Sequence, residues 1–156
     1  MSIKEKLEDL AAGSPWVYRL NTGSCNGCDV EVATTVLCPR YDLSRFGVRL
    51  VGSPKHADIV LITGPVTERC KDAVLRILEQ VPEPRVILTI GNCPASGNVY
   101  QGSYSLAGPV SELIPVDVSV LGCLPSPWAI IDGVVKAKEI WKKKLREYQI
   151  KERKEG

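Results

Sequence analysis

The sequence has little of several features that would place a protein in a special class. It contains one histidine, one methionine and one phenylalanine, and its net charge is only +2. So small a net charge gives no global sign of nucleic-acid binding, and we expect no nucleic-acid partner. The longest apolar runs, such as Ile59–Ile62, have the length of strands and fall far short of the ~20 residues of a membrane span.

The start of the chain also lacks the apolar stretch of a signal peptide, because Met1–Leu10 is charged and amphipathic. We therefore expect an intracellular protein, in which thiols stay reduced. A chain of 156 residues, 44% of them hydrophobic, fits one globular domain that can bury a core without disulfides. The six cysteines then point to metal or redox chemistry rather than to a disulfide framework.

Apolar runs alternate with helical patterns along the chain. We expect strands at Trp16–Leu20, Val48–Val51, Asp58–Thr63, Arg85–Ile90 and Asp117–Leu121. We expect helices at Ile3–Ala12, Asp29–Leu37, Thr67–Gln80 and Ser126–Arg146, and an irregular segment over Asn92–Pro115. Alternating strands and helices predict an α/β protein with a mainly parallel sheet and helices on both faces.

Four cysteines follow strands of this predicted sheet. Cys25 and Cys28 come after the first strand, Cys93 after Arg85–Ile90, and Cys123 after Asp117–Leu121. Since the carboxyl ends of parallel strands meet at one edge, where open α/β sheets bind their ligands, we expect these thiols to converge. Four thiolates suit either a [4Fe–4S] cluster or a Cys₄ zinc site.

Other interpretations of the cysteines remain open at this level. The pair Cys25 and Cys28 alone could be a redox-active C-x-x-C motif. Zinc ribbons and fingers usually present two close pairs, whereas one pair plus two distant single ligands favours a cluster. We expect Cys38 and Cys70 to be structural residues, with Cys70 the competitor if one of the four ligands is wrong.

The run Gly23–Glu31 (GSCNGCDVE) resembles the cluster loop of [NiFe]-hydrogenase small subunits, above all those of membrane-bound, energy-converting hydrogenases. Downstream segments are similar to those small subunits and to the homologous complex I subunit. They are Pro39–Asp42, Arg45–Gly47, Ser53–Asp58, Pro82–Arg85, Gly91–Cys93, Pro115–Asp117, Gly122–Cys123 and Ala129–Gly133. The resemblance runs from about Trp16 to Lys138.

The resemblance implies a flavodoxin-like three-layer sandwich that holds one [4Fe–4S] cluster through Cys25, Cys28, Cys93 and Cys123. It implies that the cluster relays electrons to the [NiFe] site of a large partner subunit. The electrons would come from a ferredoxin-like multi-cluster subunit and, indirectly, from soluble ferredoxin. Membrane subunits would translocate ions, and this chain would lie on the cytoplasmic side of the membrane as a peripheral subunit.

Two details bear on which branch of the family the chain resembles. The complex I homologue has adjacent cysteines in the first loop, whereas Asn26 and Gly27 separate them here, which favours the hydrogenase-like branch over a quinone reductase. The family loop after the fourth ligand typically reads Cys-Pro-Pro-Arg-Pro-Glu, but here it is Cys123–Trp128 (CLPSPW). The missing Arg and Glu leave room for another terminal acceptor, such as that of the sulfur-reducing complexes of this lineage.

Several polar residues are candidates for contacts or relays. Glu31 is a candidate for a polar relay or a partner contact, the alternative being a carboxylate favoured by the helix dipole. A second group is expected to form an interface: Arg40, Tyr41, Asp42 and Arg45. His56, the only histidine, is expected to be a surface residue. No phosphate-binding loop follows the first strand, so we expect no flavin.

The remaining predictions concern segments. The loop Ser96–Pro109, rich in Tyr, Gly and Ser, is expected to pack against the catalytic partner. From Lys136 onward the chain has nine Lys or Arg and four Glu, which suits contact with anionic lipid or an acidic partner, or a solvated helix end. We expect an N-terminal helix (1–15), a cluster-binding domain (16–138) and a basic helical tail (139–156).

Overall fold

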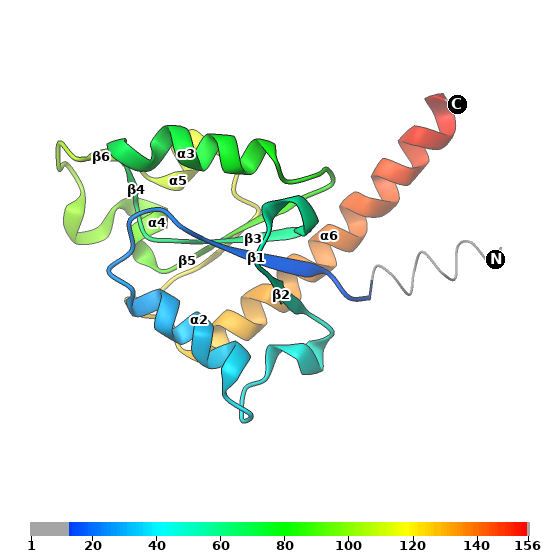
Figure 1. Ribbon diagram of the computed structural model, residues 1–156, viewed down its shortest axis with the longest axis horizontal. Helices are drawn as coiled ribbons and strands as arrows, with labels where there is room; N and C mark the ends of the chain where they lie inside the picture. The colour runs from blue at the N-terminus through cyan, green and yellow to red at the C-terminus, as the bar shows by residue number, and fades with distance from the viewer. Residues whose placement is uncertain (1–12, 156) are drawn as a thin grey trace.

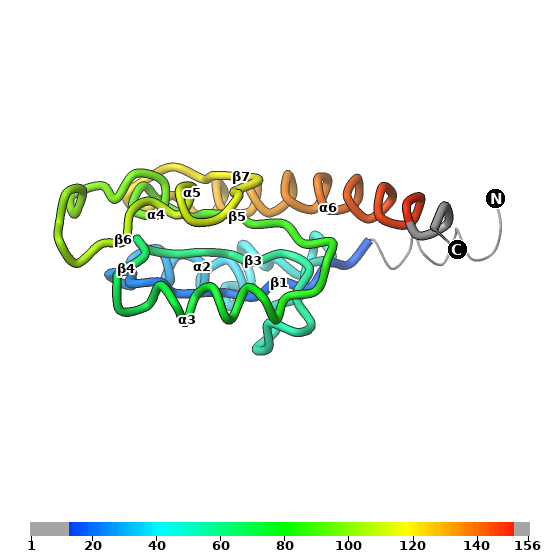
Figure 2. The backbone as a smooth tube through the Cα atoms, turned by 90° about the horizontal axis from the view of Figure 1, so that it is seen from above, coloured from blue at the N-terminus to red at the C-terminus, as the bar shows by residue number. Residues whose placement is uncertain are grey.

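A computed structural model describes residues 13–155 of the chain, with side chains described as far as residue 151 (Figure 1). The helix predicted over Ile3–Ala12 lies outside the described residues. The described part begins next to the first strand and ends in a long helix that extends away from the rest of the molecule (Figures 1 and 2).

A five-stranded parallel sheet forms the centre of the molecule. Its strands are β1 (Trp16–Asn21), β2 (Arg49–Val51), β3 (Ile59–Thr63), β5 (Val86–Ile90) and β7 (Val118–Val120). They lie in the order β2-β1-β3-β5-β7, and every neighbouring pair is parallel. Counted within this sheet, that is the 2-1-3-4-5 order of flavodoxin-like folds, so the predicted fold is confirmed.

Helices cover both faces of the sheet. Figure 1 shows the three layers nearly edge-on, and Figure 2 looks onto the strands. Helices α2 (Gly27–Leu37) and α6 (Pro127–Glu155) lie on one face, and α3 (Glu68–Glu79) and α5 (Val110–Leu113) lie on the other. This arrangement follows from right-handed crossovers between parallel strands, which place each connecting helix on a face of the sheet.

The central strand β3 shows how the sheet divides the core. All five of its residues are buried. Ile59 and Leu61 pack with α2 and α6, whereas Val60 and Ile62 pack with α3 and α5. Successive side chains of a strand point to opposite faces, so a continuous apolar run serves two cores at once.

The segment predicted to be irregular, Asn92–Pro115, contains short ordered elements. Helix α4 (Asn92–Ser96) follows β5, a 3₁₀ turn η3 (Asn98–Tyr100) follows α4, and β6 (Leu106–Gly108) pairs antiparallel with β4 (Val66–Thr67). Elements of three to five residues show too little periodicity to be recognised in a sequence. Two further 3₁₀ turns are η1 (Leu43–Phe46) and η2 (Pro54–His56).

Helix α6 continues past the predicted helix end at Arg146 through the segment predicted as a basic helical tail, and it crosses a whole face of the sheet. It begins near Cys123 at the carboxyl edge and packs closely on β7, because a Cβ at Gly133 would lie 2.2 Å from Val120 Cγ2. At the opposite edge, Trp141 is buried against the same core. Among residues 13–155, no helix has both the length and the apolar content needed to cross a bilayer.

Candidate metal centre

Four cysteines line one pocket at the carboxyl edge of the main sheet. Cys25 lies in the loop after β1, and Cys28 lies in the first turn of α2. Cys93 lies in α4 after β5, and Cys123 follows β7. The other lining residues are Ser24, Gly27, Gly64, Asn92, Gly122 and Leu124. The cavity volume of about 90 Å³ is several times the ~10–15 Å³ that one water molecule requires, so a group of several atoms has room.

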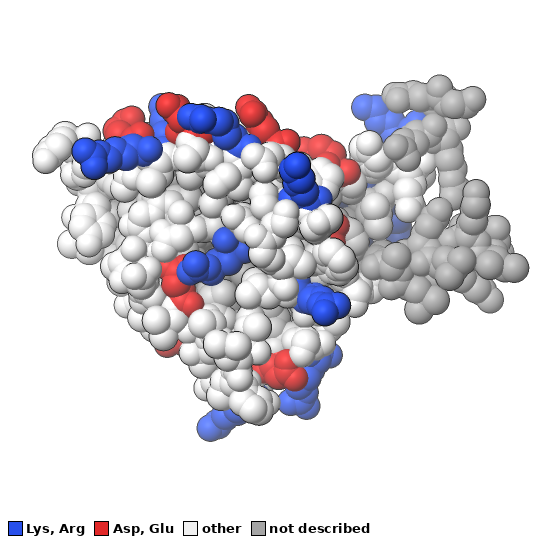
Figure 3. Space-filling view, in the orientation of Figure 1, with Lys and Arg blue, Asp and Glu red and all other residues white. Residues whose placement is uncertain are grey.

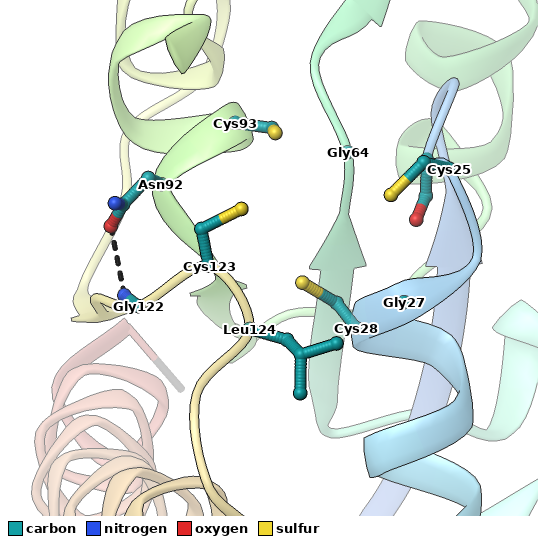
Figure 4. A pocket seen from close by; sticks show the side chains of 10 residues that line it. Cys25, Gly27, Cys28, Gly64, Asn92, Cys93, Gly122, Cys123 and Leu124 are labelled. Carbon is teal, nitrogen blue, oxygen red and sulfur yellow. Dashed lines mark hydrogen bonds between the residues drawn. The ribbon is translucent and has the colours of Figure 1, made fainter. Parts of the chain in front are cut away.

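The four sulfurs face a common space from two sides (Figure 4). The sulfurs of Cys25 and Cys28 point into it from the β1–α2 side, and those of Cys93 and Cys123 point into it from the opposite side. Cys28 is buried and Cys93 is half-buried, whereas Cys25 and Cys123 are exposed. The arrangement therefore surrounds a space with thiols and leaves it open on one side.

Local hydrogen bonds shape the loop that carries the first pair. Asn21 Oδ1 accepts hydrogen bonds from the backbone N–H groups of Gly23 and Ser24, at 2.9 and 3.0 Å. Ser24 Oγ accepts one from the N–H of Asn26 at 3.0 Å, and Asn26 has a left-handed backbone with φ 68°. Asparagine tolerates that conformation better than most residues, so the chain can turn into α2 between the two cysteines.

Two glycines allow the backbone to approach this site closely. Gly64, after β3, has φ +82°, and a Cβ there would lie 2.3 Å from the backbone N of Ser24. Gly91, after β5, has φ +98°, and a Cβ there would lie 2.7 Å from Cys28 Sγ. Any larger residue at either position would displace the first cysteine loop.

The second pair of cysteines is connected through Asn92 and Gly122. The Asn92 side-chain oxygen accepts a hydrogen bond from the N–H of Gly122 at 2.8 Å (Figure 4), and the N–H of Asn92 donates to the carbonyl of Gly122 at 3.1 Å. Each of these residues directly precedes a cysteine, Cys93 or Cys123. The two loops are thereby held at a fixed separation although they are 30 residues apart in sequence.

The thiols affect one another electrostatically. Burial, followed by the neighbouring Cys93, Cys25 and Cys123, raises the pKa of Cys28 to about 11. Each of these causes disfavours the thiolate form of Cys28. A positively charged occupant would offset the mutual repulsion of the thiolates, and this donor set fits iron or zinc.

A buried carboxylate lies directly beside the site and was not predicted from the sequence. Asp29, 7% exposed, accepts hydrogen bonds from Arg19 Nη1 at 2.5 Å, Asn21 Nδ2 at 2.9 Å and Thr63 Oγ1 at 2.7 Å. It thereby links the start of α2 to β1 and β3. The sequence did contain one sign of this buried carboxylate: Arg19 places a charge within an otherwise apolar strand, and such a charge needs a partner of opposite sign.

The two remaining cysteines do not line the pocket. Cys38 follows the last residue of α2 and is half-buried, and Cys70 lies half-buried in the first turns of α3 against the α3/α5 core. Among the residues described, no three His, Cys, Asp or Glu side chains form a group that could hold a single metal ion.

None of the predicted contact residues lines the pocket. Glu31 is half-buried on α2 and does not line the pocket. Arg40 and Arg45 are exposed beyond the other end of α2, Tyr41 packs edge-on against Trp128 with ring centroids 5.4 Å apart, and Asp42 caps η1. His56 is exposed beside Trp16.

Several exposed apolar side chains lie in the segments next to the four cysteines. Leu124, which lines the pocket, is 49% exposed, and the predicted contact loop carries Tyr104 at 98%. The other exposed apolar residues of the first turns of α2 and α6, of η3 and of the segment after β7 are Val30, Val99, Tyr100, Leu121 and Trp128. In Figure 3 the left side of the molecule, where the carboxyl edge lies, is largely uncharged, whereas charged side chains gather over α3. The edge thus has the composition of a protein contact surface.

The sequence matches a known family over most of its length. The family described as NADH ubiquinone oxidoreductase, 20 Kd subunit, matches residues 25–137. A probable membrane-bound hydrogenase subunit (mbhJ) of Pyrococcus furiosus is 53% identical over 81% of this chain and 75% of its own length. Formate hydrogenlyase subunit 7 of Escherichia coli is 38% identical over 92% of this chain, which spans 56% of that subunit.

Solved structures give the same fold. A chain of the membrane-bound sulfane sulfur reductase, an archaeal respiratory membrane complex, superposes with a TM-score of 0.74 at 32% identity, covering 90% of this chain and 77% of that one. The [NiFeSe] hydrogenase of Desulfovibrio vulgaris Hildenborough superposes with a TM-score of 0.57 at 19% identity, covering 85% of this chain and 62% of that one. The latter likeness concerns the fold alone.

Proposed function

The chain belongs to the family of the NADH ubiquinone oxidoreductase 20 Kd subunit, and from this we propose that it is an electron-transfer subunit of a membrane-bound oxidoreductase complex. The observation that carries the proposal is the convergence of four thiols on one pocket. We assign one [4Fe–4S] cluster to this pocket, held by Cys25, Cys28, Cys93 and Cys123.

The pocket fits a cluster better than a single ion. Its four sulfurs surround a space that several atoms can fill (Figure 4), whereas a zinc ion draws its ligands to about 2.3 Å from one point. When bound, such a cluster supplies one-electron transfer at a potential that its surroundings set.

The protein's own residues would hold and position this group. The four thiolates ligate it, Gly64 and Gly91 keep the space free of Cβ atoms, and the Asn92–Gly122 pair fixes the distance between two of the loops. Asp29 fixes the helix that carries Cys28. Leu124 contributes an apolar side chain at the mouth of the pocket.

A partner subunit would cover the open side of the site. Cys25 and Cys123 are exposed in the isolated chain, and the edge around them is apolar and largely uncharged (Figure 3). Burial of a cluster under a neighbouring subunit lowers its access to solvent, which is one of the factors that set its potential. The loop Ser96–Pro109, with Tyr104 fully exposed, is our candidate for part of that contact.

The finer assignment is an energy-converting hydrogenase. The hydrogenase subunit from P. furiosus is 53% identical, and the Cys25–Asn26–Gly27–Cys28 spacing resembles that branch. The large partner would hold a [NiFe] site, a ferredoxin-like subunit with several clusters would deliver electrons from soluble ferredoxin, and membrane subunits would translocate ions. The chain would sit peripherally on the cytoplasmic side.

A sulfur-reducing complex is the second candidate, favoured by one specific likeness. The sulfane sulfur reductase chain superposes with a TM-score of 0.74 and is 32% identical to this chain. Ser126 and Trp128 also stand where the family pattern has Arg and Glu. A quinone-reducing complex is the third candidate, since the matching family is described by a subunit of an NADH ubiquinone oxidoreductase.

Metal analysis of the intact, anaerobically purified complex tests the proposal. We expect iron and acid-labile sulfide, and an EPR signal on reduction that is lost in a Cys93→Ser variant. Stoichiometric zinc at this site without sulfide would falsify the cluster assignment in favour of a zinc-stabilised scaffold. Nickel in the complex with ferredoxin-dependent hydrogen formation supports the hydrogenase assignment, whereas reduction of sulfane sulfur or quinone without hydrogen formation supports the alternatives.

A further inference from the structure

The chain reverses direction immediately after the helix that carries Cys93. Helix α4 is followed by Gly97, whose φ is +78°, and Asn98 is also left-handed with φ 48°. The N–H of Gly97 donates to the carbonyl of Cys93 at 2.8 Å, and the N–H of Asn98 donates to Ser96 Oγ at 3.3 Å. Two successive left-handed residues fold the Asn98 side chain back over the first turn of α4.

This reversal brings the Asn98 amide to the sulfur of Cys93. Asn98 Nδ2 donates to Cys93 Sγ at 3.9 Å, a long hydrogen bond that the large sulfur atom permits, and Asn98 is half-buried. Asparagine is one of the few residues that combine tolerance of a left-handed backbone with a short side-chain N–H donor. The position therefore suits a donor aimed at this sulfur.

We propose that Asn98 is a positioning residue that raises the reduction potential of the group held by Cys93, an inference that rests on the proposed cluster. Reduction adds one electron, delivered by an iron–sulfur donor, and so adds one negative charge to the cluster and its thiolates. An N–H group aimed at a ligand sulfur stabilises the more negative state more strongly. Hydrogen bonds to the sulfurs are one of the means by which proteins set cluster potentials.

Two substitutions distinguish the effect of the Asn98 side-chain N–H from the effect of the left-handed backbone at this position. Asn98→Gly removes the amide and accepts a left-handed backbone without strain. Asn98→Asp keeps the shape but replaces the N–H donor by a negative carboxylate. Gln80→Glu is the matched control, because it makes the same change from amide to carboxylate on an exposed residue at the far end of α3.

The test is an EPR-monitored redox titration of the intact complex, after iron and sulfide content have been measured. We expect the equilibrium constant for reduction to fall several-fold in Asn98→Gly and further in Asn98→Asp, with tenfold corresponding to about 59 mV for one electron. Gln80→Glu should leave it unchanged. Variants with full cluster content and the wild-type potential would overturn the inference while leaving the proposed function intact.

A second measurement keeps the test decisive if the variants lose the cluster. In wild-type complex carrying asparagine ¹⁵N-labelled at the side-chain amide, pulsed EPR of the reduced state should detect a hyperfine coupling. Among the described residues, Asn98 is the asparagine whose side-chain amide donates to a cysteine sulfur. Absence of any asparagine side-chain coupling would overturn the inference. Absence of iron and sulfide from the wild-type chain would instead overturn the proposed function, and this inference with it.

Discussion

The hydroxyl of Thr63, the last residue of β3, donates a hydrogen bond to the buried carboxylate of Asp29 at 2.7 Å. Asp29 directly follows Cys28, so this bond connects a candidate ligand on α2 to the central strand of the sheet. Arg19 and Asn21 of β1 donate to the same carboxylate. The position of Cys28 thus depends on a polar network as well as on the packing of α2.

We expect Asp29→Ala to lower the free energy of unfolding by about 2–3 kcal/mol, because it leaves buried donors without their charged acceptor. Asp132→Ala is the matched control, since Asp132 forms an exposed ion pair with Lys136 on α6 and should change stability by about 0.5 kcal/mol or less. Anaerobic urea unfolding measures both. Equal effects of the two substitutions would show that the Asp29 network contributes no more than a surface ion pair.

Gly91→Ala should abolish or strongly reduce metal binding. A Cβ at position 91 would lie 2.7 Å from Cys28 Sγ, at a backbone φ of +98° that alanine rarely adopts. Gly102→Ala is the matched control, because Gly102 has a similar φ of +80° but open space around the added Cβ. The control should show only the cost of backbone strain, about 1–3 kcal/mol.

Iron and sulfide content of the two glycine variants provides the measurement. We expect Gly102→Ala to retain the wild-type content and Gly91→Ala to lose most of it. Full loading of Gly91→Ala would mean that Cys28 does not take part in the site in the geometry described.

Serine substitutions separate the four pocket cysteines from the other two. Cys93→Ser should reduce iron content, because it removes one of four converging thiols. Cys38→Ser and Cys70→Ser should leave iron content unchanged, since neither residue lines the pocket. Loss of iron in Cys70→Ser, with Cys93→Ser unaffected, would reverse our assignment of the ligands.

The strands and the meeting of the cysteines were predictable for one physical reason. A continuous apolar run such as Ile59–Ile62 has to be buried on both faces of a sheet, which is typical of a parallel sheet covered by helices. In such a sheet the segments that follow the strands meet at one edge, and this brings Cys28 close to Cys123. The contact of Asn98 with Cys93 was not predictable, because it depends on two left-handed residues that leave no periodic signal. That the four cysteines are cluster ligands stays a prediction.

The pH dependence of stability should reveal Asp58. Burial raises the pKa of Asp58 above the ordinary 3.8, although its carboxylate accepts a hydrogen bond from the Trp16 N–H at 2.7 Å. The folded protein therefore disfavours the charged form of this carboxyl group. The contribution of Asp58 to the stability of the fold is fully present below pH 3.8, where the group is protonated, and it is lost as the pH rises through the raised pKa.

Asp58→Asn keeps an acceptor for the Trp16 N–H and removes the desolvated charge. We expect the variant to be at least as stable as the wild type at pH 7, with any advantage disappearing as the pH falls below 3.8. Urea unfolding at several pH values measures this difference. A variant that is less stable at pH 7 and not at acidic pH would contradict the assigned direction of the shift.

The last prediction concerns the anchoring of α6 at the amino edge of the sheet, opposite the cysteines. Trp141 is 6% exposed, and its indole N–H donates to the carbonyl of Pro84 at 3.1 Å. One turn later Lys144 donates to the carbonyl of Arg85 and to Asp117. Asp117 in turn accepts from the N–H of Ile87 in β5, so the helix is connected to the starts of two strands.

Trp141→Ala should therefore lower the free energy of unfolding by about 3–5 kcal/mol, the usual cost of removing a large buried aromatic side chain. Trp141→Phe, which keeps most of the packing but loses the indole donor and part of the ring area, should retain much of that stability. Val99→Ala, on an exposed side chain, should change it little. If Trp141→Ala cost no more than Val99→Ala, the burial of Trp141 and its hydrogen bond to Pro84 would contribute little to the stability of the fold.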